Sequence, residues 1–190
     1  MNKIIYEDNH LIAVYKKSGE IVQGDKTGDK PLSKEIKSYL KTKYKKPGNV
    51  FLGTIHRLDR PTSGIVLFAK TSKSLSRMNE LFKNKKVQKT YYAVTEDKPN
   101  KVKGVIISLL KKNQKQNKSY ITKSDYGKKS ELEYDLIEKL QNYFLIKVKP
   151  KTGRHHQIRV QLSSIGCKIK GDVKYGAKRA NKDKSICLHS

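Results

Sequence analysis

The sequence predicts an α+β fold in which a mixed, mainly antiparallel β-sheet is flanked by helices and loops. Two observations predict it. Strand-like and helix-like segments follow one another without the strict β-α-β alternation of a parallel sheet. Two strand-like segments in the second half are separated by four residues, the spacing of an antiparallel hairpin. A length of 190 residues fits a single domain, residues 1–190.

The first third of the chain predicts two strands and a helix. Residues 3–19 hold two short apolar segments around an acidic turn, typical of paired strands. Residues 31–44 predict a helix, because Pro31 suits a first helical turn. Its apolar residues recur at helical spacing: Leu32, Ile36 and Leu40.

The next segment predicts two strands with a loop between them, followed by a helix. Residues 51–55 and 64–70 are strand-like, and the loop between them contains Asp59. Residues 71–84 predict an amphipathic helix. Its apolar face consists of Leu75, Met78, Leu81 and Phe82.

The second half predicts a hairpin. Residues 130–138 alternate with period two, so that Leu132 and Tyr134 share a face opposite to the acidic residues. Residues 143–149 provide the second strand. Residues 111–120 are polar and basic, and we expect them to form a mobile loop.

A last helix is predicted over residues 152–166. Thr152 is its expected N-cap and Gly166 its C-terminal stop. Its expected buried stripe consists of Ile158, Leu162 and Ile165.

The charge balance indicates a polyanionic partner. The chain has 43 Lys and Arg against 17 Asp and Glu, a formal net charge of +26. Such an excess favours nucleic acid or an anionic membrane surface. Because the apolar runs are much shorter than the roughly 20 residues of a spanning helix, we expect RNA and no membrane. Acidic residues near the N-terminus argue against a secretory signal, and we interpret Cys167 and Cys187 as reduced thiols of a cytoplasmic protein.

Several enzyme classes are disfavoured by the motifs. The adjacent His155 and His156 would point about 100° apart on a helix, so they would not share a metal ion, and we expect no metal site. The glycine-flanked serine of hydrolases does not occur, and neither phosphate-binding glycine pattern is present. A metal-dependent nuclease would need clustered carboxylates, which the chain does not show.

Asp59 is the candidate catalytic carboxylate. It lies between Arg57 and Arg60, whose positive charges favour its ionised form. An ionised carboxylate is a poor acid but is available as a nucleophile or base. Taken by itself, an Asp in such a loop is more often a turn or ion-pair residue.

Arg154 and Tyr91 each admit two interpretations. Arg154 falls in the first turn of the predicted helix, where a cation is disfavoured unless an anion such as a phosphate or Asp59 is near. It could equally be a solvated surface residue. Tyr91 and Tyr92 lie in a strand-like run and must point to opposite faces, so a place in the core is the usual explanation for one of them.

Several sequence blocks together resemble the RluA-type pseudouridine synthases. HRLDRPTSG is similar to the family's H-R-L-D-x-x-T-S-G loop, and VQKTYYAV to its K-x-Y-x-A strand. TGRHHQIR is similar to its T-G-R-x-H-Q-I-R helix, and GDVKYG followed by LHS to its G-D-x-x-Y-G and L-H-A elements. The blocks follow the family's order over nearly the whole chain.

The resemblance implies a pseudouridine-synthase fold and isomerisation of uridine to pseudouridine in structured RNA, without a cofactor or metal. Asp59 matches the family's catalytic aspartate, Tyr91 the tyrosine that stacks on the target base, and Arg154 the arginine that pairs with the aspartate. Arg57 matches an arginine that displaces the flipped base, and Leu188 an apolar residue lining the pocket. Large-subunit ribosomal RNA is the expected substrate.

The sequence departs from the family's pattern at some points, and it leaves alternative substrates and functions open. Lys17 replaces the proline of the family's K-P-x-G turn, which should affect loop stiffness. We expect no accessory N-terminal RNA-binding domain, and a chain that lacks the family's C-terminal strands after Ser190. Transfer RNA is an alternative substrate, and a non-catalytic RNA-binding or ribosome-assembly module is an alternative function. We expect a monomer.

Overall fold

The computed structural model describes residues 3–25 and 28–190. The chain divides into two compact units, Met1–Val87 and Gln88–Ser190, and each is described by itself. The single-domain assignment stays a prediction. The expected α+β class is confirmed, because strands that pair antiparallel are combined with helices in both units.

The first unit is built on a sheet whose order, within residues 3–25 and 28–87, is β1-β2-β4-β3. Its strands are β1 (Ile4–Glu7), β2 (Leu11–Lys16), β3 (Gly53–Thr54) and β4 (Gly64–Ala69). The pairs β1–β2, β2–β4 and β3–β4 are antiparallel, which confirms the strands expected in residues 3–19, 51–55 and 64–70.

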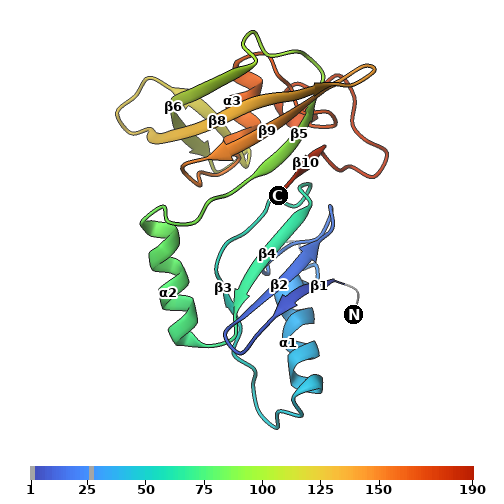
Figure 1. The fold of residues 1–190 in the computed structure, drawn as a ribbon, viewed down its shortest axis with the longest axis vertical. Helices are drawn as coiled ribbons and strands as arrows, with labels where there is room; N and C mark the ends of the chain where they lie inside the picture. The colour runs from blue at the N-terminus through green and yellow to red at the C-terminus, as the bar shows by residue number, and fades with distance from the viewer. Residues whose placement is uncertain (1–2, 26–27) are drawn as a thin grey trace. The chain divides into compact units, whose positions relative to one another are not determined.

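Helix α1 (Leu32–Lys43) covers a face of this sheet (Figure 1). The residues predicted to form its apolar stripe, Leu32, Ile36 and Leu40, are at most 2% exposed. The strands of this unit also bury apolar residues, which include Ile12, Val14, Val66 and Phe68. Burial of these side chains drives the docking of the helix.

Helix α2 (Ser72–Lys83) begins with a capping box between Thr71 and Ser74. The Ser74 amide donates to Thr71 Oγ1 at 3.1 Å, and the Thr71 amide donates to Ser74 Oγ at 3.3 Å. These bonds satisfy amides that lack a partner in the helix. Of the predicted apolar face, Leu81 is 38% exposed, so this helix is less deeply packed than α1.

The carboxylate of Glu7 joins β1 to the end of α1 and to β4. It accepts hydrogen bonds from Lys43 Nζ (2.8 Å), Lys70 Nζ (2.9 Å), Tyr44 Oη (2.7 Å) and Tyr39 Oη (3.1 Å). Burial raises the pKa of Glu7, but the hydrogen bonds outweigh burial and lower this pKa to about 2. The turn that the sequence identifies as acidic is therefore a cross-link of the first unit.

The second unit is built on a sheet whose order, across residues 88–190, is β10-β5-β9-β8-β6-β7, and neighbouring strands in it are antiparallel. Its strands are β5 (Tyr91–Thr95), β6 (Lys103–Asn113), β7 (Lys118–Thr122), β8 (Lys128–Lys139), β9 (Phe144–Pro150) and β10 (Leu188–His189). The β8–β9 pair confirms the predicted hairpin, and Leu132 and Tyr134 are buried on the predicted face.

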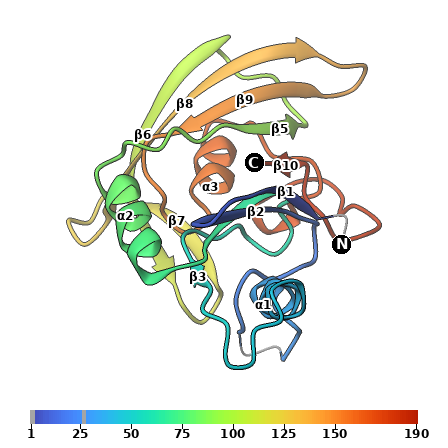
Figure 2. The ribbon, with the colours of Figure 1, turned by 60° about the horizontal axis from the view of Figure 1, so that its bottom comes forward.

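Helix α3 (Gln157–Ser164) packs on a face of this sheet (Figure 2). Its residues Ile158 and Leu162 belong to the hydrophobic core together with sheet residues that include Leu132, Ile146 and Val148. Gly166 follows the helix with a φ of 84°, a left-handed value that glycine adopts easily, and this confirms it as the stop. A short 3-10 helix, η1 (Val173–Tyr175), lies further along the chain.

The predicted start of this last helix is wrong. The helix begins at Gln157, because His156 has a φ of 53° and a ψ of 23°, which no right-handed helix accommodates. Thr152 is therefore not its N-cap. Arg154 lies before the helix, so the expectation based on the helix dipole does not apply to it.

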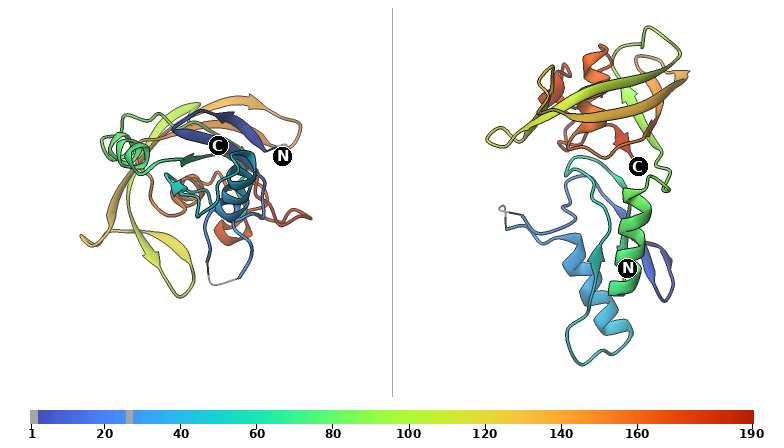
Figure 3. Two further views of the ribbon diagram at one scale, coloured as in Figure 1. Left: turned by 90° about the horizontal axis from the view of Figure 1, so that it is seen from below. Right: turned by 90° about the vertical axis from the view of Figure 1, so that its left-hand side faces the viewer.

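The predicted mobile loop over residues 111–120 is also wrong. The end of β6 pairs with β7, with Lys111 opposite Tyr120 and Asn113 opposite Lys118. The hairpin extends from the sheet in the left panel of Figure 3. Strand pairing depends on backbone hydrogen bonds, and a polar, basic composition does not prevent them.

The cysteines agree with the interpretation as free thiols, because Cys167 and Cys187 are both unbridged. Burial raises the pKa of Cys167 to about 11, which keeps this thiol protonated. Among the described helices, none combines the length and the apolar character that crossing a membrane requires.

Candidate active site

Asp59 lies, as predicted, in the loop between β3 and β4, and it is half-buried. Leu58 beside it is 8% exposed and anchors the loop in the first unit. The Thr62 amide donates to the Asp59 carbonyl oxygen at 3.0 Å, which closes a turn directly after the carboxylate.

The side chain of Lys16 stabilises this loop through hydrogen bonds to its backbone. Lys16 is the last residue of β2 and is fully buried. Its ammonium donates to the backbone carbonyl oxygens of Thr62 (2.6 Å), Asp59 (3.1 Å), Arg60 (3.1 Å) and Lys17 (3.2 Å). Burial lowers the pKa of Lys16 to about 8, although the negative charges of Glu20 and Asp59 oppose that shift.

The turn after β2 braces the same loop. Gly19 donates its amide to the Arg60 carbonyl at 2.8 Å, and Ser18 Oγ donates to the Pro61 carbonyl at 3.0 Å. Gly19 has a φ of 88°, which favours glycine at this position. The Lys-Lys-Ser-Gly turn and the Asp59 loop therefore form one hydrogen-bonded structure.

The two arginines beside Asp59 have different surroundings. Both Arg57 and Arg60 are exposed. Arg60 Nη2 forms an ion pair with Asp29 Oδ2. Sequence reasoning did not identify Asp29, because nothing in its position relates it to the loop.

His56 supports the start of the loop. Its Nε2 accepts a hydrogen bond from the Leu67 amide at 3.1 Å, and its ring stacks on Phe82 with centroids 5.4 Å apart. An acceptor at Nε2 requires the proton to be on Nδ1 when the ring is neutral. The role predicted for the histidines was structural, and this contact is structural.

Tyr91 begins β5 and pairs with Val148 of β9. It is half-buried and packs against the core of the second unit, while Tyr92 on the opposite face is 43% exposed. The alternation predicted for the two tyrosines is thus confirmed. Leu188 of β10 pairs with Ala93 and is 4% exposed within the same core.

Arg154 is exposed and lies over the beginning of β8. Its Nε donates to the Lys129 carbonyl at 3.2 Å, and its amide donates to Gln157 Oε1 at 3.0 Å. Thr152 Oγ1 donates to the same Gln157 oxygen at 2.7 Å and accepts from the Glu131 amide at 3.0 Å. The side chains of Gln157 and Thr152 therefore shape the backbone that carries Arg154.

Lys89 is a candidate that the sequence analysis left without a role. Its Nζ donates to the Thr152 carbonyl at 3.1 Å, and burial lowers its pKa. It thereby joins the strand of Tyr91 to the segment of Arg154. The sequence feature that could have identified Lys89 is its position two residues before Tyr91, as the lysine of the K-x-Y-x-A pattern.

A buried ion pair fixes the helix that follows Arg154. Arg159 donates to Asp172 through Nε (2.6 Å) and Nη2 (2.8 Å), with both side chains at most 5% exposed. This two-bond geometry orients the guanidinium as well as pairing its charge. Asp172 belongs to the G-D-x-x-Y-G block, so a sequence signal for it existed.

The predicted site residues belong to different units. Asp59 and Arg57 lie in Met1–Val87, and Tyr91, Arg154 and Leu188 lie in Gln88–Ser190. In the second unit, Lys89, which precedes the strand of Tyr91, is hydrogen-bonded to Thr152, two residues before Arg154. The meeting of these residues with Asp59 stays a prediction.

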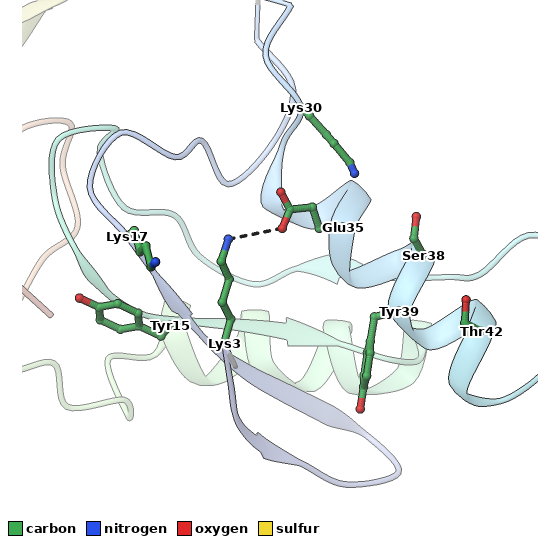
Figure 4. Close-up of a pocket in the computed structure, with 8 residues that line it drawn as sticks. All are labelled: Lys3, Tyr15, Lys17, Lys30, Glu35, Ser38, Tyr39 and Thr42. Carbon is green, nitrogen blue, oxygen red and sulfur yellow. Dashed lines mark hydrogen bonds and ion pairs between the residues drawn. The ribbon is translucent and has the colours of Figure 1, made fainter. Parts of the chain in front are cut away.

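A separate open groove of about 730 Å³ lies in the first unit, between β2 and α1 (Figure 4). Its lining residues are Lys3, Tyr15, Lys17, Lys30, Glu35, Ser38, Tyr39 and Thr42. Lys3 Nζ points across it to Glu35 at 3.4 Å and also pairs with Glu20. The groove is thus bridged by an ion pair, and it contains none of the predicted site residues.

The described residues were also searched for groups of side chains that could bind a metal ion. Within residues 3–25 and 28–190, no cluster of three His, Cys, Asp or Glu side chains has the arrangement of a metal site. His155 and His156, expected on a helix, precede it instead, and their rings stack with centroids 3.7 Å apart.

Comparison with known proteins establishes the family to which this fold belongs. The model of the RNA pseudouridylate synthase family matches residues 10–164. The chain belongs to this family.

Curated relatives agree with this assignment. The chain is 42% identical over 178 residues to the ribosomal large subunit pseudouridine synthase C of Rickettsia felis, which covers 92% of this chain and 56% of the relative. It is 35% identical over 193 residues to the ribosomal large subunit pseudouridine synthase D of Borreliella burgdorferi, which covers 98% of this chain and 59% of the relative. The chain thus spans little more than half the length of these relatives.

Solved structures support the fold. The human RNA pseudouridylate synthase domain containing 4 protein has a TM-score of 0.83 at 23% identity, covering 99% of this chain and 82% of that chain. The human domain containing 1 protein has a TM-score of 0.76 at 23% identity, covering 98% of this chain and 75% of that chain.

Proposed function

We propose that the chain isomerises uridine to pseudouridine in structured RNA. The observation that carries the proposal is the family match over residues 10–164, with Asp59 at the motif's carboxylate position in a loop held by Lys16. The sequence places a candidate base-stacking tyrosine, Tyr91, and a candidate partner for the carboxylate, Arg154, in the same ordered motifs.

The reaction breaks the bond between the anomeric carbon of the ribose and the ring nitrogen N1, turns the uracil, and joins the anomeric carbon to C5. The proton on C5 is lost and N1 gains one, so the reaction is balanced without a redox partner. Asp59 acts at the sugar, either by attacking the anomeric carbon or by removing a neighbouring proton. Neither role requires a metal or an organic cofactor.

The base has to leave the RNA stack first, which costs a few kcal/mol. Stacking on Tyr91 offsets this by about 1–3 kcal/mol. Arg57 occupies the space of the extruded base in the RNA, and Leu188 contributes an apolar wall to the pocket. Arg154 pairs with the Asp59 carboxylate.

Large-subunit ribosomal RNA is the substrate that we propose. The relatives from Rickettsia felis and Borreliella burgdorferi are named for it, and the net charge of +26 suits a large polyanion. We further propose that the protein acts as a monomer in the cytoplasm. Transfer RNA and a non-catalytic RNA-binding role are the competing proposals.

The test treats unmodified ribosomal and transfer RNA transcripts with the protein in EDTA and maps pseudouridine by chemical sequencing. We expect product with wild type and none with Asp59→Asn, while both bind RNA within about twofold because the change leaves the lysines intact. Glu138→Gln, which removes an exposed carboxylate from β8, is the matched control and should retain activity. Product from Asp59→Asn would refute the assigned role, and no product from wild type on either RNA would favour the binding module.

A further inference from the structure

The second unit carries a basic arm, residues 111–129, which comprises the β6–β7 hairpin and the segment that leads to β8. The arm has seven lysines and one acidic residue, Asp125. Apart from the half-buried Lys118, its lysines are exposed. An exposed surface with this charge is complementary to a phosphate backbone.

Aromatic side chains accompany these lysines. Tyr126 is 87% exposed and Tyr120 is 40% exposed. Lys118 Nζ lies 5.3 Å from the centre of the Tyr120 ring. Exposed rings among cations are the combination on which unpaired RNA bases stack.

A groove of about 390 Å³ runs along the hairpin. It is lined by Lys111, Lys112, Asn113, Tyr120, Ile121 and Thr122. A protein partner would require acidic side chains to match these lysines, whereas any RNA strand supplies one phosphate per nucleotide. The charge and the rings together favour RNA.

The arm is held in place by contacts with η1. The Ser119 amide donates to Tyr175 Oη at 2.8 Å, and the Tyr175 hydroxyl in turn contacts His156 Nδ1 at 2.9 Å. Burial, together with nearby cations such as Arg159, lowers the pKa of His156 to about 2, so this ring is neutral. Its Nδ1 therefore accepts a hydrogen bond from the Tyr175 hydroxyl. Lys174 Nζ donates to the Asn117 carbonyl at 3.3 Å.

His155 joins the tip of the arm to the segment of Arg154. Its Nδ1 lies 2.8 Å from Ser119 Oγ, and its Nε2 lies 3.1 Å from Asn117 Oδ1. Ser119 Oγ is also 2.8 Å from the His155 carbonyl. The residue directly before His155 is Arg154, whose Nε bonds to the carbonyl of Lys129 at the base of the arm.

We propose that the basic arm is an RNA-contact surface and that His155 is a positioning residue that keeps Arg154 in register with it. RNA held along the arm then presents its target nucleotide to a correctly placed Arg154. The inference rests on the proposed function for its catalytic part, whereas the RNA contact stands on the arm by itself.

The first experiment measures RNA binding against salt concentration for the variant K111Q/K112Q/K115Q. Its matched control is K34Q/K37Q/K41Q, which removes the same charge from exposed positions of α1. We expect binding to weaken roughly tenfold for the arm variant, with a log K versus log[salt] slope shallower by about 2, because phosphate contacts are lost. Equal effects in the two variants would overturn the RNA-contact inference, whatever the activity of the protein.

The second experiment measures single-turnover pseudouridine formation at saturating RNA for His155→Ala and His155→Gln. We expect His155→Ala to lower the rate roughly tenfold through misplacement of Arg154, with the dissociation constant unchanged within about twofold. Gln can donate to Asn117 Oδ1 and should restore most of the rate. Equal rates for wild type and His155→Ala overturn the positioning role, and so does a loss that Gln does not rescue. Wild type that binds through the arm but makes no product refutes the proposed function instead.

Discussion

Each unit buries a cation close to a predicted catalytic residue, but the two units compensate that charge differently. In the first unit, Lys16 is surrounded by backbone carbonyl oxygens of the Asp59 loop. In the second unit, Arg159 forms a two-bond ion pair with Asp172. Carbonyl dipoles only partly replace hydration, whereas a carboxylate supplies a full opposite charge.

This difference determines whether the charge of each buried cation depends on pH. The pKa of Lys16 is lowered to about 8, so the cation that holds the Asp59 loop can lose its proton under mildly alkaline conditions. Arginine, in contrast, stays charged over this pH range. The support of the Asp59 loop in the first unit therefore depends on pH through Lys16.

The largest expected effect comes from breaking the ion pair of the second unit. Asp172→Asn removes the carboxylate charge that pairs with the buried Arg159 guanidinium, and we expect it to lower the free energy of unfolding by about 4 kcal/mol. Urea denaturation followed by circular dichroism measures this. A loss below about 1 kcal/mol would contradict the compensation inferred for this unit.

Lys16→Met should have the next largest effect. Methionine fills much of the space of the side chain but leaves the carbonyls of Asp59, Arg60 and Thr62 without their shared donor. We expect a loss of about 3 kcal/mol in the free energy of unfolding. Pseudouridine formation, measured in parallel, should fall further than for Lys37→Met, an exposed control on α1.

The difference in unfolding free energy between wild type and Lys16→Met should also depend on pH. Folded Lys16 releases its proton near pH 8, whereas in the unfolded chain it does so near 10.5. Between these values the unfolded state binds more protons, so the stability of wild type relative to Lys16→Met should rise with pH by an amount on the order of 2 kcal/mol. Denaturation at pH 7, 8.5 and 10 tests the sign, and a flat or falling difference contradicts the assignment.

The smallest effect is expected at Thr152. Thr152→Val keeps the shape of the side chain but removes the hydroxyl that bonds to Gln157 and Glu131. We expect a loss of about 1 kcal/mol in unfolding free energy. A larger proportional drop in the turnover rate than in RNA affinity would show that Gln157 and Thr152 shape the Arg154 backbone.

The elements with clear hydrophobic periods were predictable. Helix α1 and the β8–β9 hairpin follow the patterns of Leu32, Ile36 and Leu40 and of Leu132 and Tyr134, because a buried face imposes its period on the sequence. The start of α3 was not predictable. His156 has a positive φ, and Gln157 Nε2 donates to the carbonyl of Glu131, a residue remote in sequence.

The sequence by itself determined the family, the basic character and the order of the motifs that contain Asp59, Tyr91 and Arg154, because these depend on residue identity along the chain. The tertiary structure decided what holds those residues. The burial of Lys16 beneath the Asp59 loop and the link from His155 to Ser119 are contacts between segments far apart in sequence. No local pattern encodes such contacts, because each one depends on the free energy of the folded chain as a whole.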